Sequence, residues 1–180
     1  MSVKIVFESH STTFDNENKI ASGWYDAELS PLGIQQSFEL GDRRRNQGFD
    51  AVFVADQYRA YQSAQIAFYG TDTEIIIDPR LRECNYGDMN HTSSKEVEEQ
   101  KINRISEPFP NGESYMQTYE RMADFLKNLA MNYDGKKVLI VGARATQWGI
   151  EHFIKGTPYE TLVTTKFKWQ PGWEYELENI

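Results

Sequence analysis

Short apolar runs, separated by segments with helical character, most constrain what this chain can fold into. Most of the runs are continuously apolar, as in Ala51-Val52-Phe53-Val54. Such runs are typical of strands buried on both faces, which occur in parallel sheets covered by helices. The expected strands are residues 3–7, 51–54, 73–77, 137–142 and 173–177.

Helix signals fall between these expected strands. Ser30 is a suitable N-cap with Pro31 at the first helical position, and Asp56 is expected to cap the following helix. The alternation predicts a three-layer α/β/α sandwich with a mainly parallel sheet, formed by a single domain over residues 1–180. The expected helices are residues 31–47, 58–69, 94–101, 113–133 and 143–155.

Composition limits the classes of partner. The chain has 19 basic and 27 acidic residues and a net charge of −8, which argues against nucleic acid or an anionic membrane as the main partner. Cys84 is the only cysteine, so neither an internal disulfide nor a thiolate metal cluster can form. With no visible secretory signal and no apolar run long enough to span a bilayer, we expect a cytoplasmic protein.

The segment 78–112 is the least regular part of the chain. Proline and glycine punctuate it, and it contains the short acidic helix expected at 94–101. We expect this segment to cover part of the active site and to contribute to specificity.

Polar residues follow three of the expected strands. His10 follows the first strand, Arg59 opens the helix after the second, and Ala143 and Arg144 follow the fourth. In open α/β sheets, ligands bind beyond the carboxyl ends of the strands, so these residues are expected to face one crevice, which Glu83 could overhang. Taken singly, each has a simpler explanation, such as a surface histidine or a glutamate in a salt bridge.

Several segments together resemble the histidine phosphatase superfamily, which is phosphoglycerate mutase-like. Residues 9–16 resemble its Arg-His-Gly motif with the later Thr and Asn, and the match continues in order along nearly the whole chain. The other matching segments are residues 22–33, 56–64, 81–88, 112–121 and 138–147.

This resemblance implies a phosphatase that works through a phosphohistidine at His10 and needs neither a metal nor a cofactor. Arg59 would clamp the phosphate oxygens. Glu83 would act as the acid and base on the leaving oxygen and the attacking water, with its pKa raised by burial or by the phosphate. The other residues expected to bind phosphate are Ser9, Asn16, Ser22, Gly23 and Arg144.

The chain departs from the family motifs at the phosphate pocket. Ser9 stands where the arginine before the nucleophile is expected, and Ser11 replaces the glycine after it. Arg144 or Arg82 could replace the missing charge. Ala143 occupies the position of the second histidine, and losing one donor to the transition state costs about 10² to 10³ in rate. His152 is an unsuitable replacement, because it lies about 14 Å further along the helix axis.

Three functions therefore remain open. We favour a phosphomonoester hydrolase impaired by Ala143. One explanation for this alanine is a histidine-to-alanine substitution made to trap a ligand, and whether it is natural or engineered is left open. The alternatives are a natural pseudophosphatase that binds a phosphorylated small molecule, and a mutase. Mutases of the family are usually longer, which favours hydrolysis. Trp24 or Trp148 could stack on a substrate ring, although core packing is the simpler role. The substrate and the oligomeric state are left open.

Overall fold

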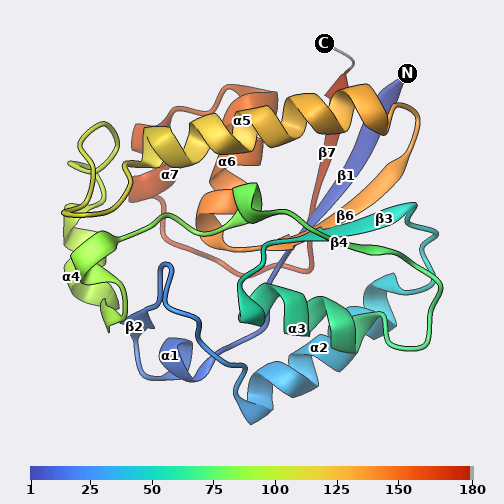
Figure 1. The fold of residues 1–180 in the computed structure, drawn as a ribbon, viewed down its shortest axis with the longest axis horizontal. Helices are drawn as coiled ribbons and strands as arrows, with labels where there is room; N and C mark the ends of the chain where they lie inside the picture. Colours follow the sequence, from blue (N-terminus) through green and yellow to red (C-terminus); the bar gives the residue numbers. More distant parts are fainter. Residues whose placement is uncertain (179–180) are drawn as a thin grey trace.

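The computed structural model describes residues 1–178, so the last two residues of the expected domain lie outside the described residues. A five-stranded sheet in the order β4-β3-β6-β1-β7 forms its centre (Figure 1). The neighbours among β4, β3, β6 and β1 are parallel, and β7 is antiparallel to β1. The mainly parallel sheet is confirmed. The strands are β1 (Ser2–Ser9), β3 (Ala51–Val54), β4 (Ile75–Ile77), β6 (Lys137–Gly142) and β7 (Trp173–Glu178).

Helices cover both faces of this sheet, as expected for a three-layer sandwich. Figure 1 shows α2 and α3 on one side of the sheet and α5 and α6 on the other. The bounds of the helices are α2 (Pro31–Arg44), α3 (Tyr58–Ala67), α4 (Ser94–Gln100), α5 (Tyr115–Asn132) and α6 (Arg144–Lys155). None of the helices in residues 1–178 combines the length and the apolar character that crossing a bilayer requires.

The strand order explains why distant segments meet. β6 lies between β1 and β3, with Ser9 opposite Gly142 and Val54 opposite Val141. The segments that leave the carboxyl ends of these three strands are therefore neighbours at one edge of the sheet. A site at this edge takes residues from each of them.

Local signals set the helix boundaries largely as expected. The Ser30 hydroxyl accepts a hydrogen bond from the Gly33 N–H at 3.2 Å, and Pro31 is the first helical residue. Ser114 caps α5 in a capping box with Gln117, so this helix starts two residues later than expected. The prediction that Asp56 caps α3 is wrong. The N-cap is Gln57, and the Asp56 carboxylate instead pairs with Arg82.

Close packing positions α2 against the loop that follows β1. A Cβ atom at Gly33 would lie 1.9 Å from the Thr12 carbonyl oxygen, so only glycine allows this approach. Leu32 and Phe38 remain exposed, whereas Ser37 and Gly41 face the protein. The buried face of α2 is thus built for close contact with neighbouring backbone.

Several short elements were not predicted. They include a two-stranded sheet of β2 (Ile20–Ala21) with β5 (Thr92–Ser93), which joins two loops that are far apart in sequence. The others are α1 (Phe14–Glu17), α7 (Tyr159–Thr164) and the 3-10 turns η1 (Pro79–Leu81) and η2 (Gly87–Met89). Strands of two residues leave too little pattern for sequence reasoning.

A buried ion pair joins β1 to the end of α2. The Glu8 carboxylate is 1% exposed and accepts hydrogen bonds from Arg44 Nε at 2.7 Å and Arg43 Nη2 at 3.1 Å. Arg44 also donates to the Pro171 carbonyl oxygen at 3.0 Å. This cluster therefore connects the strand that precedes His10 with the segment that precedes β7.

We predict that Arg44→Met destabilises the fold by about 3 kcal/mol, because removing one partner of a buried pair leaves the other charge poorly compensated. Urea unfolding followed by circular dichroism measures this change. Lys95→Gln is the control, since its ammonium is exposed on α4, and it should leave the midpoint unchanged. Equal stability of the Arg44 variant and the parent chain would contradict the prediction.

Candidate active site

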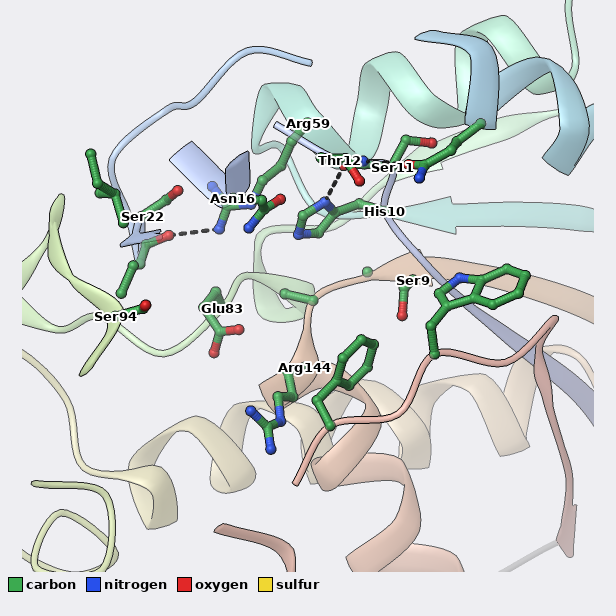
Figure 2. A pocket seen from close by; sticks show the side chains of 18 of the residues that line it. Ser9, His10, Ser11, Thr12, Asn16, Ser22, Arg59, Glu83, Ser94 and Arg144 are labelled. Carbon is green, nitrogen blue, oxygen red and sulfur yellow. Dashed lines mark hydrogen bonds between the residues drawn. The ribbon is translucent and has the colours of Figure 1, made fainter. Parts of the chain in front are cut away.

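A cavity of about 640 Å³ opens at the carboxyl ends of β1, β3 and β6. Every residue that the sequence predicted for the site lines it (Figure 2). His10, Arg59 and Asn16 lie on one side in this view, and Glu83 and Arg144 lie on the other. The full set is Ser9, His10, Asn16, Ser22, Gly23, Arg59, Glu83, Ala143 and Arg144.

The backbone and one ring nitrogen orient His10. The backbone N–H of His10 donates to the Gly142 carbonyl oxygen at 2.9 Å. The ring Nδ1 atom lies 2.8 Å from the Ser11 carbonyl oxygen. A carbonyl oxygen only accepts, so Nδ1 carries the proton in this bond. The Nε2 atom then holds the lone pair and can act as a nucleophile.

The surroundings keep this imidazole neutral. Burial of the ring, with the neighbouring Arg59 guanidinium, lowers the pKa of His10 to about 4. A group with this pKa is unprotonated at neutral pH. The histidine therefore has the charge state that nucleophilic attack requires.

Arg59 is a buried cation whose charge is not balanced by a direct ion pair. It is 3% exposed, and burial lowers its pKa. It donates to the carbonyl oxygens of Gly23 at 2.7 Å and Tyr25 at 3.0 Å.

Three other cationic side chains line the cavity, and each has a carboxylate partner: Arg43 with Glu8, and Lys101 and Arg144 with Glu98. Within residues 1–178, Arg59 alone among these cations has no such partner.

Neutral groups surround this charge. Asn16 Oδ1 accepts from the Thr13 N–H at 3.0 Å, which leaves its Nδ2 to donate. The Ser22 hydroxyl donates to Asp15 at 2.8 Å, so it is committed to that carboxylate. Gly23 has φ 55°, and a Cβ there would lie 2.1 Å from Asn90 Oδ1, so glycine is required at this turn.

Backbone amide groups hold the carboxylate of Glu83. Its Oε1 accepts from the Cys84 N–H at 2.7 Å, and its Oε2 accepts from the Ala145 N–H at 3.4 Å. The second of these bonds comes from the first turn of α6, which favours a negative charge. Glu83 is thus anchored between two segments while it still lines the cavity.

Ala143 lies directly before α6 and presents only a methyl group to the cavity. Its N–H donates to Thr146 Oγ1 at 3.1 Å, and that hydroxyl donates to the Leu81 carbonyl oxygen at 2.8 Å. This bonding orients the backbone at position 143 without help from its side chain. His152 lies outside the cavity, where its Nδ1 contacts the Thr157 carbonyl oxygen at 2.7 Å.

The two arginines that might replace a charge at Ser9 are both engaged elsewhere. Arg82 pairs with Asp56 and does not line the cavity. Arg144 donates to Glu98 at 3.1 Å and to the Thr165 carbonyl oxygen at 2.6 Å. The hydroxyl of Ser11 packs away from these groups, 2.8 Å from Ser37 Oγ.

Some residues of the cavity were missed by sequence reasoning. Lys101 lines it and is buried, which lowers its pKa, and it donates to Glu98 at 2.5 Å. Trp24 and Trp148, for which ring stacking was the less favoured role, do not line it, and Trp148 is buried in the core. Trp169 and Phe167 line the cavity instead. Their segment has neither a strand nor a helix pattern, so the sequence offered no signal.

A family model described as the histidine phosphatase superfamily (branch 1) matches residues 5–169. The "Putative phosphoserine phosphatase 2" of Hydrogenobacter thermophilus is 27% identical over 161 residues, which cover 85% of this chain and 79% of that protein. The "Probable phosphoglycerate mutase GpmB" of Escherichia fergusonii is 29% identical over 147 residues, covering 77% and 68%.

A solved structure shares the fold. "Bacillus stearothermophilus YhfR" superposes with a TM-score of 0.82 at 22% identity, and the match covers 94% of this chain and 88% of that one. In the described part of the chain, no three histidine, cysteine, aspartate or glutamate side chains are grouped to hold a metal ion.

We predict that the His10 imidazole titrates near pH 4 rather than near 6.5, and that Arg59→Met raises this pKa because it removes a neighbouring positive charge. Two-dimensional NMR of the chain with ¹⁵N-labelled histidine measures the midpoint. A midpoint of 6.5 for His10 in the parent chain would be inconsistent with the burial described here.

Proposed function

The chain belongs to branch 1 of the histidine phosphatase superfamily, and on this basis we propose that it is a phosphomonoester hydrolase that acts through His10 and is impaired by Ala143. The observation that carries the proposal is a neutral His10 whose Nε2 is free, in the same cavity as Arg59, which among the arginines and lysines of the described residues that line it is the one without a carboxylate partner. A nucleophile and an anion site are thus available together.

In the proposed first step, His10 Nε2 attacks phosphorus and the bond to the leaving oxygen breaks. Arg59 holds two phosphate oxygens with its planar guanidinium, and Asn16 Nδ2 and the Gly23 backbone add neutral donors. The bound phosphate dianion disfavours a second negative charge beside it, so Glu83 is protonated in the complex. It gives this proton to the leaving oxygen, which makes the alcohol a better leaving group. The product is a phosphohistidine at His10.

In the proposed second step, water hydrolyses this intermediate. Glu83, now a carboxylate, takes a proton from the attacking water, the P–N bond breaks, and inorganic phosphate leaves. Glu83 is then protonated again and the His10 imidazole is free, so both side chains are ready for the next cycle. We propose that the segment 78–112 covers the site during these steps, since Val97, Glu98 and Lys101 of its helix region line the cavity.

A second candidate function is ligand binding without turnover, and the methyl group of Ala143 favours it. The expected second histidine would donate to the transferring oxygens, and alanine cannot. The relatives' names include both a phosphatase and a mutase. A mutase would return the phosphoryl group to its substrate instead of releasing inorganic phosphate.

We predict that Ala143→His raises the rate of phosphate release at least about a hundredfold, the size of one regained transition-state donor. A panel of phosphomonoesters with a phosphate-release assay measures this change. Adding His10→Ala to that variant should abolish the activity. If the Ala143→His chain stays inactive on every ester, binding without turnover becomes the better explanation.

We also predict that Glu83→Gln in the Ala143→His background slows alkyl phosphate hydrolysis by about 10² to 10⁴. Hydrolysis of p-nitrophenyl phosphate should fall much less in its first step, because its leaving group needs no proton. Burst kinetics separate the two steps. Equal losses of the burst rate on both classes of ester would exclude Glu83 as the acid.

A further inference from the structure

The cavity is larger than a phosphate group requires. The residues proposed to bind phosphate occupy one part of it, but about 640 Å³ is in the range of sites that hold a whole small molecule. The remaining space must accept the leaving group, whose chemistry the proposed reaction does not specify. The residues that line this space therefore indicate which kind of leaving group the site can bind.

One of these walls is residues 165–172, which link α7 to β7. Phe167 and Trp169 from this segment line the same cavity as His10. Their side chains are nevertheless 51% and 56% exposed. Large aromatic side chains that stay exposed inside a cavity offer flat apolar surface to a ligand.

Arginine side chains hold both rings in place. The Arg43 guanidinium lies 5.6 Å from the centre of the Trp169 ring, and the Arg144 guanidinium lies 5.6 Å from that of Phe167. Arginines also fix the backbone at both ends of the segment, because Arg144 Nη2 donates to the Thr165 carbonyl oxygen at 2.6 Å and Arg44 Nη2 donates to that of Pro171 at 3.0 Å. The exposed rings are thus anchored and not simply part of a free loop.

The arginines near these rings already have carboxylate partners, and each of these carboxylates is shared with a second cation, Arg44 or Lys101. Arg43 pairs with the buried Glu8 and Arg144 pairs with Glu98. A second anionic group of a substrate would have to compete with these carboxylates. A neutral planar ring would need only the aromatic surface, and bases stack favourably on such surfaces in proteins that bind single-stranded nucleic acid.

We propose that the leaving group of the substrate carries a planar ring that packs against Trp169 and Phe167. This inference rests on the proposed function, because it takes the phosphate to lie beside His10 and Arg59. It assigns the substrate class as ring-bearing phosphomonoesters, such as nucleoside monophosphates or aryl phosphates, in preference to small acyclic phosphates.

Equilibrium binding to the chain as it exists, with Ala143, tests this assignment. Isothermal titration calorimetry would compare AMP, UMP and phenyl phosphate with ribose 5-phosphate and glycerol 3-phosphate, with phosphate release monitored in parallel. We predict that at least one ring-bearing ester binds about tenfold or more tightly than the esters without a planar ring. Trp169→Ala should remove most of this difference and leave ribose 5-phosphate binding unchanged.

Two further variants separate ring contact from a structural effect. Trp169→Phe retains an aromatic surface and should retain most of the preference. Phe38→Ala removes an equally exposed aromatic side chain from α2, outside the cavity. It should change neither the affinity for ring-bearing esters nor the affinity for esters without a ring. Circular dichroism would verify that each variant is folded.

The outcomes distinguish this inference from the proposed function. Esters with and without a ring could bind with equal affinity, and Trp169→Ala could leave both affinities unchanged. The proposed phosphate site would then be retained, and the ring assignment would be overturned. If a preference survives Trp169→Ala together with Phe167→Ala, the ring binds elsewhere and the assignment is also overturned. If none of the esters binds, both proposals fail.

Discussion

The parallel pairing of β1 with β6 is the constraint on which the rest of the site depends. It places Ser9 opposite Gly142 and lets the His10 N–H donate to the Gly142 carbonyl oxygen at 2.9 Å. His10, the proposed nucleophile, and Ala143, at the position of the expected second histidine, are therefore held at one edge of the sheet. β3 pairs with the other side of β6 and leads into the helix that carries Arg59, so three strands assemble one cavity.

Burial controls the chemistry of this cavity more than net charge does. The protein is acidic overall, yet its site contains a buried guanidinium without a direct carboxylate partner and a histidine whose pKa burial lowers to about 4. These two effects support one another, because the Arg59 charge also disfavours protonation of His10. A phosphate dianion would relieve the cost of the buried cation. Site preorganisation of this kind lowers the reorganisation that a reaction needs.

The segment of residues 165–172 connects this chemistry to the rest of the fold. Arg44 ties it to the buried Glu8 on β1, and Arg144 ties it to α4 and to the start of α6. A change in any of these contacts would move the wall of the cavity that faces the leaving group. Ala143 breaks none of them, since its backbone bond to Thr146 is intact. The missing side chain thus affects the proposed reaction without a visible effect on the fold.

The sequence by itself determined the layers, the mainly parallel sheet and the residues that gather at its carboxyl edge, because apolar periodicity and the positions of strand ends are local properties. It also revealed the substitutions at Ser9 and Ala143. Only the tertiary structure decided which cations are free, since Arg82 and Arg144 differ from Arg59 through partners 21 to 46 residues away in the chain. It likewise showed that Trp169 lines the cavity and that Trp24 and Trp148 do not. Ion pairing and exposure depend on contacts between distant segments, and no local pattern records them.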